Sequence, residues 1–358
     1  MAQFTGELGL QFVTHLANHY SLRDLVRLAQ LGADSGFCQI WVNDNIRYRN
    51  QMVVLTAIAA QVPIRLGTAI MVPYFHNPLD MADSFAALSE LCEGREISIG
   101  IARGDLGQSP QHVQAHKPIA MVSETTRLLR RALAGEEFPY SDFPFLTEFY
   151  RLNPKGKFQL AFKPETEFKF YGGGNGAQAL RLCGRIMDGI ISSGTYIPML
   201  KAGRLEAMLA TADSAALAVE PGKRLRKVCE LNVSIAANRE HALDFPRRQV
   251  AHSILQWEAL GFTPEEYSKM GVAREQVLKL QEAFESGATV EQAAALVTDH
   301  MVRCYYAAGK PEEVRDQIIE LVGAAGRLGY DHVAFAKLGP DYDEAIKLLA
   351  GQVVPALR

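Results

Sequence analysis

Short apolar segments that end in polar residues, each followed by a helical pattern, constrain the fold of this chain most strongly. The pattern is clearest at 39–44, 64–72 and 96–102. It recurs in further segments, at 8–13, 168–172, 189–193, 227–236 and 331–336. Strands that alternate with helices form parallel sheets, and eight strand–helix units are the number that closes a barrel. We therefore predict an α/β fold of the (β/α)8 TIM-barrel class, with an open doubly wound sheet as the alternative.

Two segments interrupt this alternation and are predicted to be insertions near the rim of the barrel. Residues 136–168 hold aromatic residues, proline and glycine with little helical period, which indicates an excursion with a short hairpin. Residues 238–306 are mostly helical in pattern and are too long for one connection. We predict a single domain over residues 1–358 that carries these two insertions.

Composition excludes several classes of function. The formal net charge is −3, and no basic run resembles a nucleic-acid footprint. The five cysteines are scattered without a C-x-x-C pair, which favours reduced thiols in a cytoplasmic protein over disulfides or a zinc site. No stretch of about 18 apolar residues is present. We expect a cytoplasmic enzyme with no bound metal, no nucleic-acid partner and no membrane contact.

The clearest cue for ligand binding is the glycine-rich segment Tyr171-Gly-Gly-Gly-Asn-Gly176, which follows a strand and opens a helix. Glycine lets the backbone approach a phosphate, and the start of a helix offers unpaired N–H groups with partial positive charge. Tight connections use the same pattern, so this segment alone leaves both interpretations open. The next strand end adds hydroxyl and amide donors. The candidate phosphate-binding residues are therefore Gly173, Gly174, Asn175, Ser192, Ser193, Gly194 and Thr195.

Polar and aromatic side chains at the other strand ends are further candidates. Asp44 and Asp105 could bond a ring nitrogen or a hydroxyl, or transfer a proton, but aspartate at this position also caps the following helix. Trp41 and Phe75 could stack on a flat cofactor, although core packing is the more common role of an aromatic residue. The same predicted rim also carries His15, His76 and Arg103.

Several motifs, in order along most of the chain, resemble the bacterial luciferase-like flavin and deazaflavin oxidoreductases. They are Trp41-Val-Asn-Asp44 with Arg49-Asn50, Gly67-Thr-Ala-Ile70 with Asn77-Pro78, Gly100-Ile-Ala-Arg-Gly-Asp105, Gly173-Gly-Asn-Gly176, Cys183-Gly-Arg-Ile-Met-Asp-Gly189 and Ala308-Gly-Lys-Pro-Glu-Glu-Val314. Within this superfamily the chain is most similar to the methylenetetrahydromethanopterin reductase group, which uses the deazaflavin coenzyme F420. The Asp-x-x-x-x-Arg-Asn run and Val297-Thr-Asp-His-Met301 point to that group.

The resemblance implies a luciferase-like barrel that transfers hydride between C5 of coenzyme F420 and an electrophilic carbon of an unidentified small-molecule substrate. It implies a non-prolyl cis peptide bond between Ala69 and Ile70 behind the ring, with Asp44 facing the ring to handle a proton or to order the cofactor. The glycine-rich loop and the loop after it would hold the phosphate, while the tail or ring edge would be lined by Arg103, Gly104 and Asp105. An FMN-dependent monooxygenase and a flavin-binding barrel without turnover are the alternatives.

The chain departs from the family pattern at two positions. Many relatives have histidine where this chain has Asn45, and the reductases have proline where it has Arg103. A cation near the pocket indicates a substrate other than methanopterin. The resemblance also implies a homodimer, an expectation that the apolar residues of two predicted helices support: Val53, Val54, Leu55, Ile58, Phe85, Leu88 and Leu91.

Overall fold

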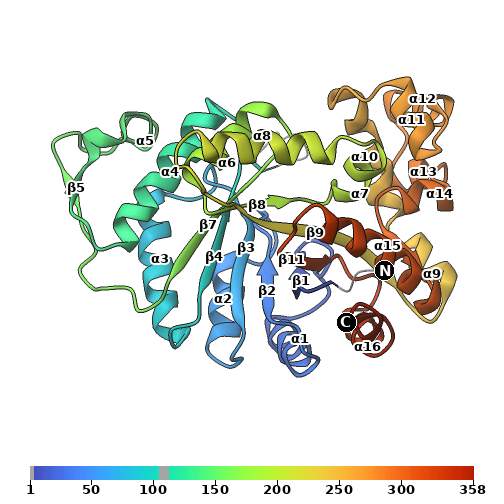
Figure 1. Ribbon diagram of the computed structural model, residues 1–358, viewed down its shortest axis with the longest axis horizontal. Coiled ribbons are helices and arrows are strands. Elements are labelled where there is room, and N and C mark those ends of the chain that lie inside the picture. The colour runs from blue at the N-terminus through green and yellow to red at the C-terminus, as the bar shows by residue number, and fades with distance from the viewer. Residues whose placement is uncertain (1–3, 105–112) are drawn as a thin grey trace. The chain divides into compact units, whose positions relative to one another are not determined.

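The computed structural model describes residues 4–104 and 113–358 (Figure 1). Contacts divide the chain into two compact units, and each is described by itself. Unit 1 comprises Met1–Glu7, Ser193–Ala207 and Cys229–Arg358, whereas unit 2 comprises Leu8–Ser192 and Met208–Val228. The single domain with two insertions stays a prediction.

In the described part of unit 2, six strands form a parallel sheet in which each strand lies beside the one before it. These strands are β1 (Glu7–Phe12), β2 (Gln39–Val42), β3 (Arg65–Met71), β4 (Ile97–Ile101), β7 (Phe168–Gly173) and β8 (Gly189–Ser192). Nearly every residue of β1 to β4 is buried, including those that point to opposite faces. Burial on both faces explains why these segments are continuous apolar runs in the sequence.

Helices connect the strands of unit 2, and successive helices pack against one another. α1 begins behind Ser21, which forms a capping box with Asp24, and α3 begins at Pro78 behind its N-cap Asn77. Both helices therefore begin where the capping residues in the sequence predict a helix start. The helices are α1 (Leu22–Asp34), α2 (Gln51–Ala59), α3 (Pro78–Leu91), α4 (Pro118–Leu133), α6 (Ala177–Ile186) and α8 (Leu205–Leu217), the last of which begins in unit 1.

The segment 136–168 contains the short hairpin that its sequence predicts. β5 (Phe138–Pro139) pairs antiparallel with β6 (Lys157–Phe158), and η2 (Tyr140–Asp142) and α5 (Pro144–Phe149) lie between them along the chain. Phe138 and Phe143 make an edge-to-face contact with ring centroids 5.2 Å apart, and both rings are fully buried. The segment therefore has a small apolar core of its own.

β3 and β4 approach each other closely at Gly100. The Thr68 hydroxyl donates to Gly100 O and accepts from Gly100 N, with both distances at 2.9 Å. A Cβ atom at Gly100 would lie 2.3 Å from Thr68 O, so only glycine fits there. The register between the two strands shifts between Thr68 and Met71, which places an irregularity at Ala69 and Ile70. This irregularity lies at the carboxyl end of β3, the end at which barrel enzymes build their active sites.

β9 (Arg226–Ile235) begins in unit 2 and continues in unit 1, where it pairs in parallel with β10 (Ala307–Gly309) and lies beside β11 (His332–Ala336). Helices α9 to α14 occupy the predicted insertion at 238–306. The helices are α7 (Tyr196–Lys201), α9 (Arg239–Asp244), α10 (Arg247–Ala259), α11 (Pro264–Met270), α12 (Arg274–Glu285), α13 (Val290–Ala294), α14 (Asp299–Arg303), α15 (Pro311–Arg327) and α16 (Tyr342–Leu348), followed by η3 (Leu349–Val353) and η4 (Val354–Ala356).

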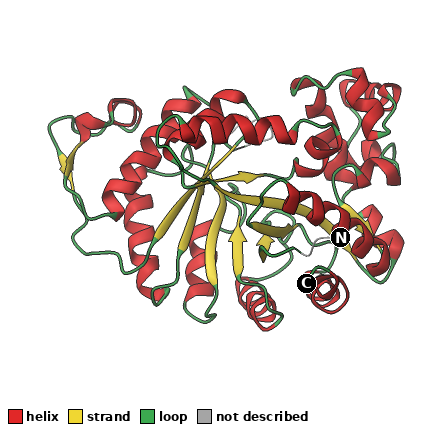
Figure 2. Ribbon diagram, viewed as in Figure 1, coloured by secondary structure: helices red, strands yellow, loops and turns green. Residues whose placement is uncertain are grey.

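Across the described chain, β1, β2, β3, β4, β7, β8, β9 and β11 are the eight predicted strands, and helices alternate with them (Figure 2). The fold is the predicted (β/α)8 barrel. Two details differ from the prediction. β10 was not expected, because Ala-Ala-Gly has no β-branched or aromatic residue. The alternation predicts one helix between β8 and β9, but the chain forms two, α7 and α8, separated at Gly203, whose φ of 77° is left-handed.

Two expectations about surfaces can be compared with this fold. None of the helices in the described residues is long and apolar enough to cross a membrane.

Most of the apolar residues offered as a dimer surface are buried within unit 2: Val54, Leu55, Ile58 and Phe85 are each 0% exposed. Only Val53, at 55%, and Leu91, at 37%, are exposed among those named. These residues therefore do not argue for pairing, and the homodimer stays a prediction.

Arg204 connects the loop before α8 to the helical insertion within unit 1. Its guanidinium forms a two-pronged ion pair with Glu266 and lies 4.3 Å from the ring centroid of Phe262. It also donates to Leu260 O at 2.8 Å and to Gly261 O at 2.6 Å. The hydrogen bonds from Arg204 lower the pKa of Glu266 to about 2.

We expect Arg204→Ala to lower the free energy of unfolding by about 3 kcal/mol, because Glu266 and two carbonyls lose their donor together. Urea denaturation followed by circular dichroism measures this change. The matched control is Arg248→Ala, whose exposed pair with Glu291 at 3.4 Å should contribute about 0.5 kcal/mol or less. Equal losses in the two variants would contradict the structural role of Arg204.

Candidate active site

The carboxyl ends of β2 and β3 bring a carboxylate and an imidazole together. Asp44 follows β2, and its Oδ2 lies 2.7 Å from Nε2 of His76, which follows β3. The same Oδ2 accepts the backbone N–H of Val72 at 3.0 Å. The side chains of Asp44 and His76 are only 6% and 15% exposed. Asp44 is therefore held firmly at the end of the sheet, and His76, which the sequence placed only at the rim, is its partner.

The pair changes the proton affinity of the imidazole. Burial lowers the pKa of His76, but the hydrogen bond and charge of Asp44, together with the charge of Asp80, outweigh burial and raise it overall. His76 therefore keeps its proton to a higher pH than an unpaired histidine would, which suits a residue that handles protons.

Because the folded protein holds the His76 proton more tightly than the unfolded chain, the pair stabilises the fold fully below the ordinary histidine pKa. This stabilisation is lost as pH rises through the raised pKa. We expect His76→Gln to lower Tm by ~3 °C more at about pH 5.5 than at about pH 8.5, which calorimetry can measure. A deficit that grows toward alkaline pH would contradict the ion pair.

The peptide bond between Ala69 and Ile70 is cis, which confirms the prediction made for it. Two buried glutamines hold the carbonyls of this dipeptide. Gln11 Nε2 donates to Ala69 O at 2.7 Å, and Gln51 Nε2 donates to Val42 O at 2.6 Å and approaches Ile70 O at 3.5 Å. The backbone N–H of Asp44 also donates to Ile70 O, at 3.2 Å. The ends of β1, β2 and β3 are thereby joined around one backbone segment.

Several buried polar atoms near this segment have no hydrogen-bond partner among residues 4–104 and 113–358. They are Gln11 Oε1, Thr14 Oγ1 and Gln51 Oε1, from side chains that are at most 2% exposed. Within the same residues, all hydrogen bonds of the Asp44 side chain use Oδ2. Its other oxygen, Oδ1, is therefore left to accept a hydrogen bond from another donor. Buried polar atoms are almost always paired in folded proteins, so such a cluster indicates a site for a polar ligand.

Two further residues complete the rim, and sequence reasoning missed both roles. The Tyr150 hydroxyl lies 2.5 Å from Pro73 O and 2.7 Å from His76 O, so the segment 136–168 braces the loop after β3. Burial raises the pKa of Tyr150 to about 12, which keeps this donor protonated. His15 Nδ1 lies 3.1 Å from Asn45 Nδ2. An imidazole is therefore present beside Asn45, supplied by a different strand end.

The glycines at the end of β7 and in the loop after it serve different purposes. A Cβ atom at Gly172 would lie 2.3 Å from Cys183 Sγ, so Gly172 allows α6 to pack on β7. Gly174 has a left-handed φ of 143°. Gly173 has neither constraint, and a Cβ atom there would lie 3.6 Å from Ile70 Cγ2 and 3.5 Å from Ala102 Cβ. Gly173 is thus the glycine whose open side faces the ends of β3 and β4.

α6 begins behind Gly176 without a capping side chain and without an acidic residue in its first turn. Its first N–H groups therefore lack the usual side-chain partner, and they carry the partial positive charge of a helix start. This arrangement suits an anion beside the glycine-rich loop.

The other predicted site residues are placed as follows. Gly104 has a left-handed φ of 75°, and a Cβ atom there would lie 2.6 Å from Val72 Cγ2, so the end of β4 packs on the end of β3. Arg103 is exposed, and Asp105 lies outside the described residues. Asn175 and Ser192 belong to unit 2, whereas Ser193, Gly194 and Thr195 belong to unit 1.

Trp41 packs in the core and is not at the rim. It is 1% exposed and meets Tyr171 edge to face, with ring centroids 5.8 Å apart. A Cβ atom at Gly67 would lie 2.5 Å from the Trp41 ring, so the indole fills the space beside that glycine. Core packing, rather than stacking on a cofactor, is the role that this environment gives Trp41.

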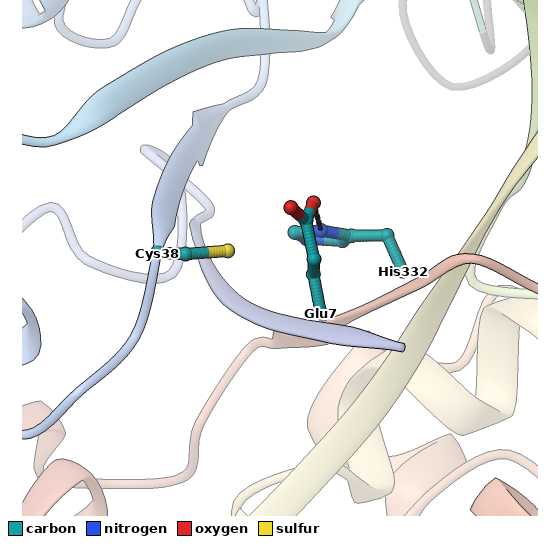
Figure 3. Close-up of side chains that lie close together, drawn as sticks. All are labelled: Glu7, Cys38 and His332. Carbon is teal, nitrogen blue, oxygen red and sulfur yellow. Dashed lines mark hydrogen bonds and ion pairs between the residues drawn. The ribbon is translucent and has the colours of Figure 1, made fainter. Parts of the chain in front are cut away.

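Three other features are less suited to chemistry. Glu7 Oε2 lies 3.5 Å from His332 Nδ1 in unit 1 (Figure 3). Both residues begin strands, and the amino ends of barrel strands serve stability rather than catalysis. In unit 2, Cys38 Sγ accepts from Arg65 at 3.1 Å. A cavity of about 890 Å³ is lined by His116 and by residues of the segment 141–154, none of which ends a strand of the barrel.

Comparison with known proteins places this site in a family. The sequence profile described as luciferase-like monooxygenase matches residues 8–328. The chain belongs to the luciferase-like monooxygenase family. The resemblance seen in the strand-end motifs is thereby confirmed, and the chain is an enzyme. In barrel enzymes the active site lies at the carboxyl ends of the strands, and Asp44 and the cis dipeptide lie at such ends in this chain.

Relatives within the luciferase-like family align over nearly the full chain. A 5,10-methylenetetrahydromethanopterin reductase from Archaeoglobus fulgidus is 25% identical over 98% of this chain and 100% of its own. An F420-dependent glucose-6-phosphate dehydrogenase from Nakamurella multipartita is 26% identical over 96% of this chain and 94% of its own. The solved coenzyme F420-dependent tetrahydromethanopterin reductase of Methanopyrus kandleri has the same fold, with a TM-score of 0.75, 22% identity and 99% of each chain covered.

Proposed function

We propose that the protein is an oxidoreductase that transfers hydride between coenzyme F420 and an electrophilic carbon of a small organic substrate. The observation that best supports this proposal concerns relatives that align over nearly their full length. Their names give different substrates but the same cofactor. The Nakamurella dehydrogenase and the Methanopyrus reductase are both named as F420-dependent. Relatives that act on different substrates but use the same cofactor must bind that cofactor with the part of the fold that they have in common. We therefore infer the cofactor of this chain from its relatives, but not the substrate.

The residues at the end of β3 fit a deazaflavin ring, which carries N–H and carbonyl groups along one edge. Asp44 Oδ1, Gln11 Oε1 and Gln51 Oε1 are acceptors for ring N–H groups, and the Thr14 hydroxyl is a donor for a ring carbonyl. Ala69 and Ile70 form the backbone surface between these side chains. When bound, F420 supplies a ring carbon, C5, that accepts or donates hydride.

The remaining cofactor contacts are proposed from the strand-end loops. Gly173 and the first turn of α6 would hold the phosphate, because their backbone N–H groups can approach an anion closely. Gly174, Asn175 and Ser192, which belong to the same unit, would complete the phosphate site. A contact of Ser193, Gly194 and Thr195 with the phosphate stays a prediction from the sequence. Arg103 and Gly104, together with Asp105, would line the tail or ring edge.

Asp44 and His76 would act together at the ring. Asp44 orders the ring through Oδ1 while its Oδ2 holds the imidazole. His76 would carry the proton that accompanies hydride transfer to a carbonyl or from an alcohol. Tyr150 fixes the backbone of His76, which keeps the imidazole in place during turnover.

The proposal is tested by incubating the protein anaerobically with oxidised F420 and a panel of alcohols, amines and aldehydes. Bleaching of the visible F420 band, with one oxidised product per cofactor reduced, is the expected result. The reverse assay uses reduced F420 with ketones, imines and activated alkenes. Failure of every substrate in both directions, while F420 remains unbound, would remove the proposal.

An FMN-dependent monooxygenase is the second candidate, and the family description favours it. The two cofactors share a ring shape and a phosphate, so the residues above would serve either. Consumption of oxygen with reduced FMN, coupled to an oxygenated product, would identify this alternative. We further propose that the protein acts as a homodimer and in the cytoplasm, where its cysteines, which form no disulfide among the described residues, would stay reduced.

A further inference from the structure

A second polar cluster lies within unit 1, around Lys337. Lys337 follows β11, and its side chain is 8% exposed. Its Nζ lies 5.4 Å from the ring centroid of Tyr306, and Glu230 attracts it from a distance. In the part of the chain that the structure describes, no carboxylate forms an ion pair with Lys337. A buried ammonium without a directly bonded anion is costly, so the position calls for an explanation.

Asn232, on β9, presents an unpaired acceptor in the same cluster. Its Nδ2 donates to Gly194 O at 2.9 Å and to Tyr305 O at 3.0 Å, which fixes the orientation of the amide. Its Oδ1 is buried and accepts no hydrogen bond from any described residue. Asn232 is 1% exposed. The amide therefore offers one oriented acceptor that the protein itself does not use.

Gly194 lies close to both groups, and a side chain there would crowd them. A Cβ atom at Gly194 would lie 3.0 Å from Lys337 Nζ and 3.2 Å from both Nδ2 and Oδ1 of Asn232. A charged donor and a neutral acceptor thus border the position of the missing side chain. Lys337 directly follows β11, and Gly194 comes two residues after the end of β8, as active-site residues of this fold class do.

The backbone at Lys337 is also unusual. Lys337 and Leu338 have left-handed φ values of 68° and 47°, although neither is glycine. Such conformations are uncommon for residues with a side chain and are concentrated at functional sites. The turn directs the lysine inward, over Tyr306, at the cost of an unfavourable backbone conformation.

We propose that Lys337, Asn232 and Gly194 form a subsite that binds the carboxylate of a small organic acid. The ammonium donates to a carboxylate oxygen, and a hydroxyl or N–H on the same molecule donates to Asn232 Oδ1. A carboxylate suits the site better than a phosphate, because a single lysine neutralises one negative charge and Glu230 would repel a second. As a substrate subsite this rests on the oxidoreductase function proposed above.

Equilibrium dialysis with labelled lactate, without any cofactor, tests the subsite directly. Lactate carries both a carboxylate and a hydroxyl. Acetate, lactamide and inorganic phosphate at matched ionic strength are the competitors. Lactate should bind, acetate should compete more weakly, and lactamide and phosphate should compete least. Lys337→Met should weaken lactate binding by about tenfold or more, and the matched control Lys310→Met, at an exposed position of the same unit, should leave it unchanged.

Gly194→Ala is the second variant, because it keeps the lysine and fills only the space beside it. It should also weaken lactate binding by about tenfold. Absence of lactate binding to the wild-type protein, or unchanged binding in Lys337→Met or Gly194→Ala, would overturn the subsite. Tighter competition by phosphate than by acetate would overturn the choice of carboxylate. Because the assay contains no cofactor, its outcome is independent of whether F420 binds.

Discussion

Asp44→Ala is expected to lower turnover by about 100-fold or more and the free energy of unfolding by about 2 kcal/mol. Asp44 Oδ2 accepts from Val72 N and holds His76, so its removal leaves a buried N–H without an acceptor and frees the imidazole. Both effects act on the end of β3, where the ring would lie. Turnover with the substrate found in the F420 assay and urea denaturation measure the two effects.

Asp44→Asn separates structure from chemistry. The asparagine oxygen can still accept from Val72 N, so most of the stability should return. The negative charge that raises the pKa of His76 is lost, so turnover should remain low. Wild-type turnover in Asp44→Ala would contradict a role at the ring, and full turnover in Asp44→Asn would contradict the role of its charge.

Gly173→Val is expected to weaken binding of F420, and of FMN, by about tenfold or more, for which about 1.4 kcal/mol suffices. A Cβ atom at Gly173 makes ordinary contacts, at 3.5 Å from Ala102 Cβ, so the fold should tolerate it. The valine methyl groups would fill the open side of Gly173, toward Ile70 and Ala102 at the ends of β3 and β4, and would hinder an anion that approaches the backbone there. Fluorescence titration of each cofactor gives the affinities.

Gly174 is a poorer position for this experiment. A side chain there would adopt a left-handed φ of 143° and would lie 2.9 Å from Ala179 Cβ, so a loss of binding could reflect a distorted loop. Gly323→Val, on the surface of α15, is the matched control, and cofactor affinity should be unchanged in it. Unchanged affinity in Gly173→Val, with the fold retained by circular dichroism, would rule out a phosphate beside this glycine.

The strands and the main positions at their ends follow from the sequence because they depend on local patterns. Continuous apolar runs predict the strands, and Asp44 and Gly173 are found simply because they lie where such runs end. The cis bond at Ala69 came from resemblance to a family, since no local pattern in the chain requires it. Each strand and each strand-end position can thus be predicted from one short segment of the sequence.

The partners of those residues could not be predicted in the same way. His76 meets Asp44 across 32 residues, and Tyr150 meets Pro73 across 77, so each contact depends on where two loops meet in space. Lys337 is inconspicuous in sequence, because its burial results from a left-handed turn that lysine rarely adopts. The short strand β10 likewise exists through pairing with β9 rather than through its own residues.

A direct competition between F420 and FMN for the wild-type protein tests the central claim most directly. Each cofactor is titrated alone under anaerobic conditions, and each is then used to displace the other, with binding read from its own fluorescence. The account predicts that F420 binds at least about tenfold more tightly than FMN and displaces it. Tight FMN binding that F420 cannot displace, with oxygen consumption by the reduced FMN complex, would contradict the account and identify a monooxygenase.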